Sequence, residues 1–219
     1  MGEARDILRC LERIRKAVAP LPAPSVSNVA AEKQDPFRIL ISTIISLRTK
    51  DQVTEEASKR LFALADTPAA MKTLPREAIQ EAIFPAGFYR NKSRQILDIA
   101  NRIDSEFNGE VPRDRDILLG FPGVGIKTAN LTLGLGYGLP YICVDTHVHR
   151  IPNRLGWIAT KSPEESEKEL MKILPKEWWI PINHLLVQFG QQICRPVSPL
   201  CSTCPNSSSC PRRGVERRR

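Results

Sequence analysis

The sequence feature that most limits how this chain can fold is a group of four closely spaced cysteines in its last thirty residues or so. The group follows the spacing C-x6-C-x2-C-x5-C and consists of Cys194, Cys201, Cys204 and Cys210. Unliganded cysteines prefer apolar cores, whereas this segment is hydrophilic and rich in proline, which keeps it extended. The spacing therefore predicts that four thiolates hold an inorganic centre, either a tetrahedral zinc ion or a four-iron cluster. Zinc sites usually contain two close pairs of cysteines, and this group contains one.

The two remaining cysteines, Cys10 and Cys143, have no partner at ligand spacing and are expected to be ordinary buried thiols. A disulfide framework is not expected, because the chain shows no secretion signal. The longest apolar run, residues 39–47, is interrupted by serine and threonine and is far too short to span a bilayer. These features predict a cytoplasmic protein with reduced thiols and no membrane association.

The formal net charge is +8, and such an excess is common among proteins that approach phosphate backbones. Five arginines against one glutamate lie in a basic tail, residues 212–219. We expect this tail to be solvated and mobile. Because the tail supplies part of the excess, charge alone barely favours nucleic acid over other polyanions.

Apolar residues recur at helical spacing along most of the chain, and strand-like alternation is nearly absent. Examples are Val53, Ala57, Leu61 and Leu64, followed by Ile96, Ile99, Ala100, Ile103 and Phe107. Proline and glycine interrupt the pattern often, which predicts an all-α protein of short helices joined by tight turns. The proline-containing segment Leu21–Asn28 is expected to be an extended connection. We expect one continuous domain at 30–139 and a second domain built from both chain ends, 1–29 plus 140–219.

A glycine-rich turn, Gly123-Val124-Gly125, precedes a helical stretch that begins at Ile126. Backbone amides in such a turn are unobstructed by side chains, and the helix end behind them is positive, so the turn can bind an anion such as a DNA phosphate. A contact of this kind positions DNA without reading its sequence. On the glycine spacing alone, a turn that binds nothing is equally consistent.

Lys127 lies in the first turn of that helix, where its charge faces the positive end of the dipole and costs stability. A cation placed against the local electrostatics suggests a function. A lysine nucleophile reacts as the neutral amine, and a helix N-terminus favours that form. The alternative is a solvated surface lysine, as most lysines are.

Asp145 directly precedes a later helical stretch and is expected to cap its N-terminus. The cap would fix its carboxylate near the hairpin helix, where it could also serve catalysis. His147 and His149 lack metal-ligand spacing and are expected to be structural. Pro152 falls inside the same helix and is expected to remove one hydrogen bond and bend it.

Together, these motifs resemble the endonuclease III family. The resemblance spans about Asp35 to Cys210 and includes all three cysteine intervals and the segments 121–125, 127–130 and 144–147. It implies an all-α, two-lobed helix–hairpin–helix DNA glycosylase fold with a 4Fe–4S cluster loop. The 30–139 segment would be a six-helix barrel domain with its helix–hairpin–helix at about 113–137. The remainder would be the iron–sulfur domain, with the four cysteines as cluster ligands in place of a zinc site.

The resemblance also implies an activity, that of a bifunctional DNA N-glycosylase and AP lyase that removes oxidised pyrimidines from duplex DNA in base-excision repair. Lys127 would be the nucleophile that forms a Schiff base, and Asp145 would assist it. The adenine-mismatch and thymine-mismatch branches of the superfamily carry serine- or tyrosine-like residues at the position of Lys127. The implied partner is double-stranded DNA with damaged bases or abasic sites, bound by a monomer associated with the nucleoid of a bacterial or archaeal cell.

An enzyme of this kind must extrude the damaged nucleotide before it can reach C1′. By resemblance, Arg48 and Phe88 lie in the two loops whose side chains fill the vacancy, and Arg195 in the cysteine loop can contact a phosphate. Bacterial members of the family frequently carry glutamine at the position of Arg48 and leucine at that of Phe88. This difference leaves the preference for the opposite base open. The alternative for Phe88 is a core aromatic beside Pro85.

Three other interpretations remain open from the sequence. The nearest is a monofunctional mismatch or uracil glycosylase of the same superfamily. The second is an iron–sulfur protein that binds DNA or transfers electrons without catalysis, which Lys127 and Asp145 at family spacing disfavour. The third is a zinc-ribbon module, which the single close cysteine pair disfavours.

Overall fold

The computed structural model describes residues 2–219, and all regular secondary structure in that range is helical. The chain divides into two compact units. The continuous unit is Pro24–Tyr141, and the split unit combines Met1–Ala23 with Ile142–Arg219. The all-α fold expected from the sequence is confirmed.

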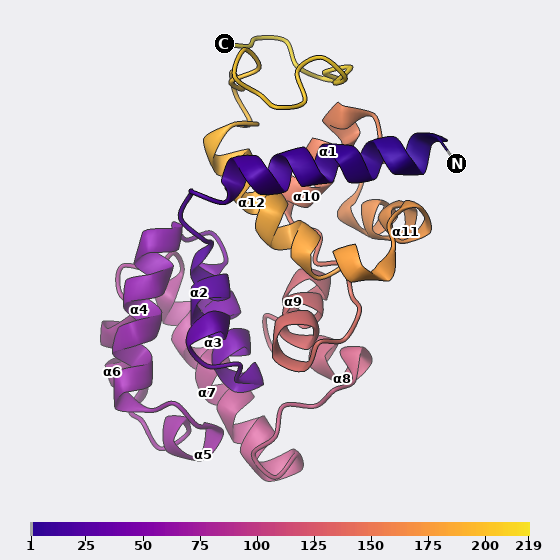
Figure 1. Ribbon diagram of the computed structural model, residues 1–219. Coiled ribbons are helices and arrows are strands. Elements are labelled where there is room, and N and C mark those ends of the chain that lie inside the picture. The colour runs from indigo at the N-terminus through magenta and orange to yellow at the C-terminus, as the bar shows by residue number, and fades with distance from the viewer. Residues whose placement is uncertain (1) are drawn as a thin grey trace. The chain divides into compact units, whose positions relative to one another are not determined.

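The continuous unit is organised around one helix that is apolar on nearly every side. Its helices are α2 (Ser25–Glu32), α3 (Pro36–Ser46), α4 (Asp51–Leu64), α5 (Pro68–Met71), α6 (Arg76–Ile83), α7 (Tyr89–Glu106), α8 (Arg115–Leu119) and α9 (Ile126–Tyr137). The central helix, α3, lies among α2, α4, α7 and α9 (Figure 1). Its start is fixed by Asp35, whose side chain accepts hydrogen bonds from the backbone N–H groups of Phe37 and Arg38. Burial of its isoleucines and of Leu40 supplies the centre of this unit's core.

Helix α9 packs along α3 and is thereby fixed over most of its length. Its residues Thr128–Gly134 are all buried. The backbones approach closely at Gly136, where a Cβ would lie 3.0 Å from Pro36. The helix ends at Gly138 in the left-handed conformation (φ 68°), whose N–H donates to the carbonyl of Gly134. The first turn of α9 therefore stands on a rigid support.

One expectation about this unit is wrong in part. The segment Leu21–Asn28 is extended only in its first half, because α2 begins at Ser25. Both prolines of the segment precede the helix, where the missing N–H is tolerated. Val26 and Val29 are buried, and their burial favours the helix over an open connection.

The split unit consists of an N-terminal helix packed on the C-terminal part of the chain. Its helices are α1 (Gly2–Val18), α10 (Thr146–Leu155), α11 (Pro163–Ile173), the 3-10 turn η1 (Lys176–Trp178) and α12 (Pro181–Gln192). Apolar residues at helical spacing on α1, among them Leu11 and Ile14, are buried against a core that includes Phe189 of α12. After α12 the chain runs as turns without helix, the yellow segment in Figure 1. Among the described residues no helix is long and apolar enough to cross a membrane.

Candidate active site and cysteine centre

The turn between α8 and α9 combines buried apolar anchors with open glycines. Phe121 and Val124 are buried, and the N–H of Val124 donates to the carbonyl of Phe121 over 3.1 Å. Gly123 between them adopts φ 78°, which favours glycine. The anchors fix the turn, and both glycines are exposed to solvent.

The N-terminus of α9 is open to a ligand. Gly125 occupies the N-cap position without a side-chain cap, and no acidic residue lies in the first turn. Apart from Gly125 itself and the two adjoining residues, no heavy atom of the described chain lies within 4 Å of the position that a Cβ on Gly125 would take. Backbone N–H groups at such an end attract anions, so the geometry fits a phosphate-binding turn.

Lys127 lies at the border between this open end and the buried part of α9. It is half-buried, and every residue from Thr128 to Gly134 after it is buried. Its backbone position is therefore set by the packing of α9 on α3. This is the placement expected for a positioned side chain at a helix N-terminus.

Asp145 caps α10, as the sequence predicts. Its Oδ1 accepts hydrogen bonds from the backbone N–H groups of His147 and Val148, both at 2.9 Å. Val144 before it is buried, and the carbonyl of Cys143 accepts a hydrogen bond from the buried Asn183 side chain. The cap bonds fix the carboxylate of Asp145, and the buried residues before it fix its backbone. Lys127 belongs to the continuous unit and Asp145 to the split unit.

The other residues of α10 have structural partners. Nδ1 of His149 lies 2.6 Å from the hydroxyl of buried Ser166, and Nδ1 of His147 lies 3.1 Å from the Arg150 guanidinium. The helix continues through Pro152 to Leu155. Both histidines therefore have the polar partners expected of structural residues.

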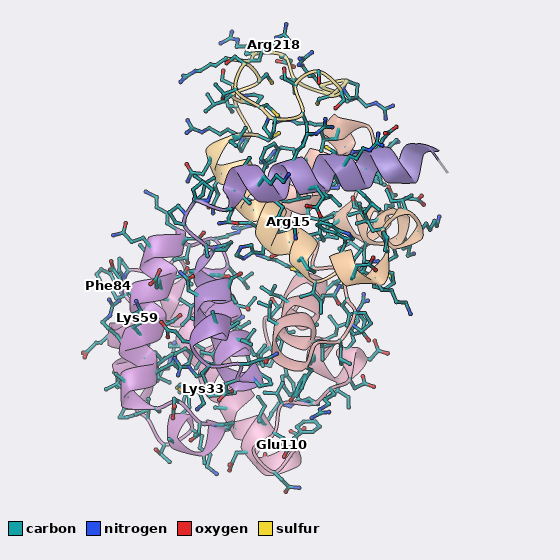
Figure 2. The ribbon with its side chains drawn as sticks, in the orientation of Figure 1. Arg15, Lys33, Lys59, Phe84, Glu110 and Arg218 are labelled. Atoms are coloured by element: carbon teal, nitrogen blue, oxygen red, sulfur yellow. The ribbon has the colours of Figure 1, made fainter. Side chains whose placement is uncertain are left out.

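The two loops that carry Arg48 and Phe88 share an unusual backbone conformation. Both residues lie in the left-handed region, with φ 52° and 58°, which costs about 1–3 kcal/mol per non-glycine residue. Phe88 is 60% exposed, so the core alternative for its ring is wrong. The Arg48 guanidinium lies over this ring, 5.5 Å from its centroid. Nearby in sequence, Phe84 also projects from the surface (Figure 2).

A residue that the sequence analysis missed lies beneath these loops. Lys92 of α7 is only 3% exposed, and its ammonium donates to the carbonyls of Ile45 and Leu47 and to the hydroxyl of Thr49. Burial lowers the pKa of Lys92 to about 8. The signal was present in the sequence, because Lys92 falls on the same helical stripe as buried Ile96 and its successors.

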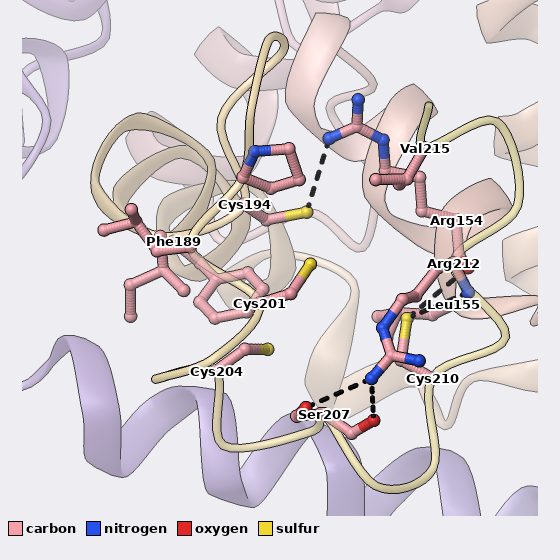
Figure 3. A pocket seen from close by; sticks show the side chains of 13 residues that line it. Arg154, Leu155, Phe189, Cys194, Cys201, Cys204, Ser207, Cys210, Arg212 and Val215 are labelled. Atoms are coloured by element: carbon pink, nitrogen blue, oxygen red, sulfur yellow. Dashed lines mark hydrogen bonds between the residues drawn. The ribbon is translucent and has the colours of Figure 1, made fainter. Parts of the chain in front are cut away.

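The four cysteines line one cavity in the split unit. Figure 3 shows the sulfurs of Cys194, Cys201, Cys204 and Cys210 directed toward a common space, which is lined by apolar side chains that include Phe189. None of the four forms a disulfide, and all four are half-buried. Burial raises the pKa of Cys204 and Cys210, so their thiolate forms require a cation or hydrogen-bond donors nearby.

The four thiols suit an inorganic centre in their chemistry, because thiolates are ligands both of zinc and of iron–sulfur clusters. Their side chains line one cavity, so the residues present fit such a centre.

Arg154 of α10 organises the cysteine loop and was also missed. This arginine is buried, and its guanidinium donates to the carbonyls of Arg195 and Pro196 over 2.6 and 2.7 Å. The same group lies 3.7 Å from the sulfur of Cys194 (Figure 3). Hydrogen bonds to ligand sulfurs stabilise thiolates and tune a cluster. Arg195 itself is exposed, and its Nε–H donates to the carbonyl of Gln192.

The remaining cysteines and the tail complete the split unit. Cys10 and Cys143 are buried, as expected, and burial raises the pKa of Cys10 to about 12. The tail is mostly exposed, as predicted, but hydrogen bonds fasten it to the cysteine loop. The N–H of Arg219 donates to the carbonyl of Pro199, and its carbonyl accepts from the N–H of Ser202, each over 2.9 Å.

Comparison with known proteins agrees with this arrangement. Residues 41–176 match the HhH-GPD superfamily of base excision DNA repair proteins. The hairpin and the helical fold thus define the class as helix–hairpin–helix base-excision repair proteins. Endonuclease III of Thermotoga maritima is 46% identical over 179 residues, which cover 82% of this chain and 84% of that protein. The chain belongs to the endonuclease III family.

Two further relatives extend the comparison. Endonuclease III homolog 2, chloroplastic, of Arabidopsis thaliana is 40% identical over 93% of this chain, which spans 57% of that protein. The solved structure of a trapped endonuclease III–DNA covalent intermediate, an estranged-adenine complex, is 36% identical. It superposes with a TM-score of 0.83 over 95% of this chain and 96% of that one.

Proposed function

We propose that this chain is a bifunctional DNA N-glycosylase and AP lyase that removes oxidised pyrimidines from duplex DNA. The observation that carries the proposal is Lys127 on the first turn of an uncapped helix, in a chain similar to an endonuclease III that has been trapped covalently on DNA. A covalent DNA intermediate requires a nucleophile, and Lys127 has the position and chemistry for it.

The proposed chemistry begins at C1′ of the damaged nucleotide. The neutral amine of Lys127 forms a bond to C1′ as the bond from C1′ to the base breaks, and the departing base takes up a proton. The sugar ring then opens to a protonated Schiff base. Loss of a proton from C2′ expels the 3′ phosphate by β-elimination, and water hydrolyses the imine to restore Lys127. Asp145, fixed by its cap bonds, stabilises the positive charge that develops on the sugar.

DNA contacts follow from the exposed groups. We assign phosphate binding to the hairpin turn Gly123–Gly125 and a further phosphate contact to Arg195. Arg48 and Phe88 form a wedge that fills the space of the extruded nucleotide, since both side chains are exposed and stacked on one another. Unstacked, damaged bases are the easiest to extrude. The proposed partner is damaged or abasic duplex DNA of the nucleoid, bound in the cytoplasm by a monomer.

We further propose that Cys194, Cys201, Cys204 and Cys210 hold a 4Fe–4S cluster, as the endonuclease III family generally does. When bound, the cluster cross-links a segment that has no helix of its own. The chain's residues do the rest: Arg154 holds the loop carbonyls, and the loop presents Arg195. In this layout the continuous unit is the barrel domain and the split unit is the cluster domain.

The proposal is tested with a duplex that contains thymine glycol, incubated with and without borohydride. We expect alkali-independent strand cleavage and a borohydride-trapped complex. Lys127→Ala should lose both while it retains DNA binding, because it removes only the nucleophile. Lys168→Ala, an exposed lysine on α11, is the matched control and should behave as wild type. Base release without trapping or cleavage would instead identify a monofunctional glycosylase.

A further inference from the structure

The two proposed wedge residues lie on separate loops that meet in the continuous unit. Arg48 follows α3, and Phe88 precedes α7. A Cβ on Gly87 would lie 2.5 Å from the carbonyl oxygen of Arg48, so the two backbones are in direct contact. Only glycine permits this approach.

The hydroxyl of Thr49 joins the loops by hydrogen bonds. It accepts from the N–H of Gly87 over 3.1 Å and from the ammonium of Lys92 over 2.9 Å, and it donates to the carbonyl of Leu47 over 3.3 Å. A hydroxyl has one donor and two acceptor sites. All three are used, so this hydroxyl fixes both loops at once.

Lys92 completes the network from below. Its three hydrogen bonds, of 2.6 to 2.9 Å, use every donor of the ammonium. Two of them end on carbonyls at the C-terminus of α3, where a cation is favoured by the helix dipole. The charge is nevertheless expensive to bury, because a desolvated ammonium loses its hydration.

An uncharged side chain of similar length would fill the same space without the desolvation cost of the ammonium, but it would leave the acceptors that Lys92 satisfies without a donor. What an apolar replacement cannot do is hold the carbonyls of Ile45 and Leu47 and the Thr49 hydroxyl together. Leu47 and Thr49 flank Arg48, whose left-handed φ of 52° is a conformation that surrounding contacts must hold.

We infer that Lys92 is a positioning residue, which clamps the two loops through Thr49 so that Arg48 and Phe88 enter the duplex as one rigid wedge. The inference rests on the proposed function, because it assigns Arg48 and Phe88 to the space left by the extruded nucleotide. The clamp removes the need to order two loops during binding, which would otherwise reduce affinity.

The test compares Lys92→Met with Thr49→Val and Thr49→Ser. Each protein is bound to a duplex with an abasic site opposite 2-aminopurine, whose fluorescence rises when the base is unstacked. We expect Lys92→Met and Thr49→Val to weaken duplex binding about tenfold and to lose most of the fluorescence rise. Thr49→Ser keeps the hydroxyl and should behave as wild type. Lys59→Met, which removes an exposed lysine of α4 (Figure 2), is the charge-matched control.

Two further measurements separate a positioning role from a structural one. Thermal unfolding should show that Lys92→Met remains folded at the assay temperature, because loss of the buried charge offsets part of the cost of the acceptors left without a donor. Borohydride trapping on a single-stranded abasic oligonucleotide should be unchanged, because no partner base has to be displaced there. If Lys92→Met and Thr49→Val both retained the full fluorescence rise and duplex affinity, the inference would be overturned.

Failure of the proposed function gives a different pattern. Wild type would then form no trapped complex on any substrate, whereas the fluorescence comparison, which requires no chemistry, would still report on the clamp. A loss of fluorescence rise in Lys92→Met would support the clamp even in that case. An absence of any fluorescence rise with wild type would overturn the wedge assignment and the clamp together.

Discussion

At the scale of single residues, the buried charge of Lys92 makes the stability of this protein depend on pH. Burial lowers the folded-state pKa to about 8, below the ordinary value of 10.5. Between these values the folded protein has released the proton and the unfolded chain retains it, so the free energy of unfolding rises as the pH increases. We expect the difference between wild type and Lys92→Met to change by at most about 3 kcal/mol between pH 8 and 10.5. Urea unfolding at several pH values measures this difference, and a constant value would contradict the prediction.

The candidate functional residues that the sequence singled out are those whose identity conflicts with their setting. Lys127 stands against a helix dipole, and the four cysteines stand in a hydrophilic loop. Lys92 and Arg154 were not identified, because a long cationic side chain on an apolar helix face usually extends its charged group to solvent. Their acceptors are backbone carbonyls from distant segments. No local pattern in the sequence reports such partners.

At the scale of elements, alanine substitution of the two hairpin glycines, Gly123 and Gly125, should have different effects on stability. Alanine at position 125 fits the extended backbone (φ −102°) and meets no atom within 4 Å, so Gly125→Ala should leave stability within about 0.5 kcal/mol. Its methyl group would nevertheless cover the open N-terminus of α9 and weaken DNA binding. Gly123→Ala should lose about 1 kcal/mol or more, because position 123 requires φ 78°.

Chemical denaturation and duplex titration of both variants check this prediction. Gly125→Ala should show weaker binding at unchanged stability, a combination that general damage to the hairpin cannot produce. Wild-type affinity in Gly125→Ala would mean that the turn does not contact DNA. Gly123→Ala provides the comparison in which the fold itself is perturbed.

Element boundaries were predictable where capping residues mark them. Asp145 and the helix after it were identified because a carboxylate before an apolar stripe has one common role, that of an N-cap. The start of α2 was missed because two prolines suggested an extended segment. A proline just before a helix is compatible with an extended segment and with a helix start alike. Tertiary burial of Val26 and Val29 decided between them, and that information is not local.

At the scale of the whole molecule, the two units differ in what holds them together. The continuous unit has a core centred on α3, whereas residues 193–219 of the split unit contain no helix. Apart from the cysteines, residues 193–219 are held by specific hydrogen bonds to the rest of the split unit. These include the Arg154 guanidinium to two loop carbonyls, and the Asn206 side chain to the carbonyl of Cys10. With so little apolar burial of its own, the segment should depend on the proposed cluster for order.

Replacement of one ligand therefore has an uneven effect on the molecule. Cys201→Ser should lose the centre, and amide hydrogen exchange should accelerate across residues 193–219 and in the last turn of α12, which leads into them. Exchange in α3 and α9 should remain as slow as in wild type, because their core lies wholly in the continuous unit. Cys143→Ser, which changes a buried thiol outside the group, is the matched control and should leave the cysteine loop protected. Equal acceleration in both units would mean that the centre supports the entire fold, and unchanged exchange in 193–219 would mean that the loop is ordered without it.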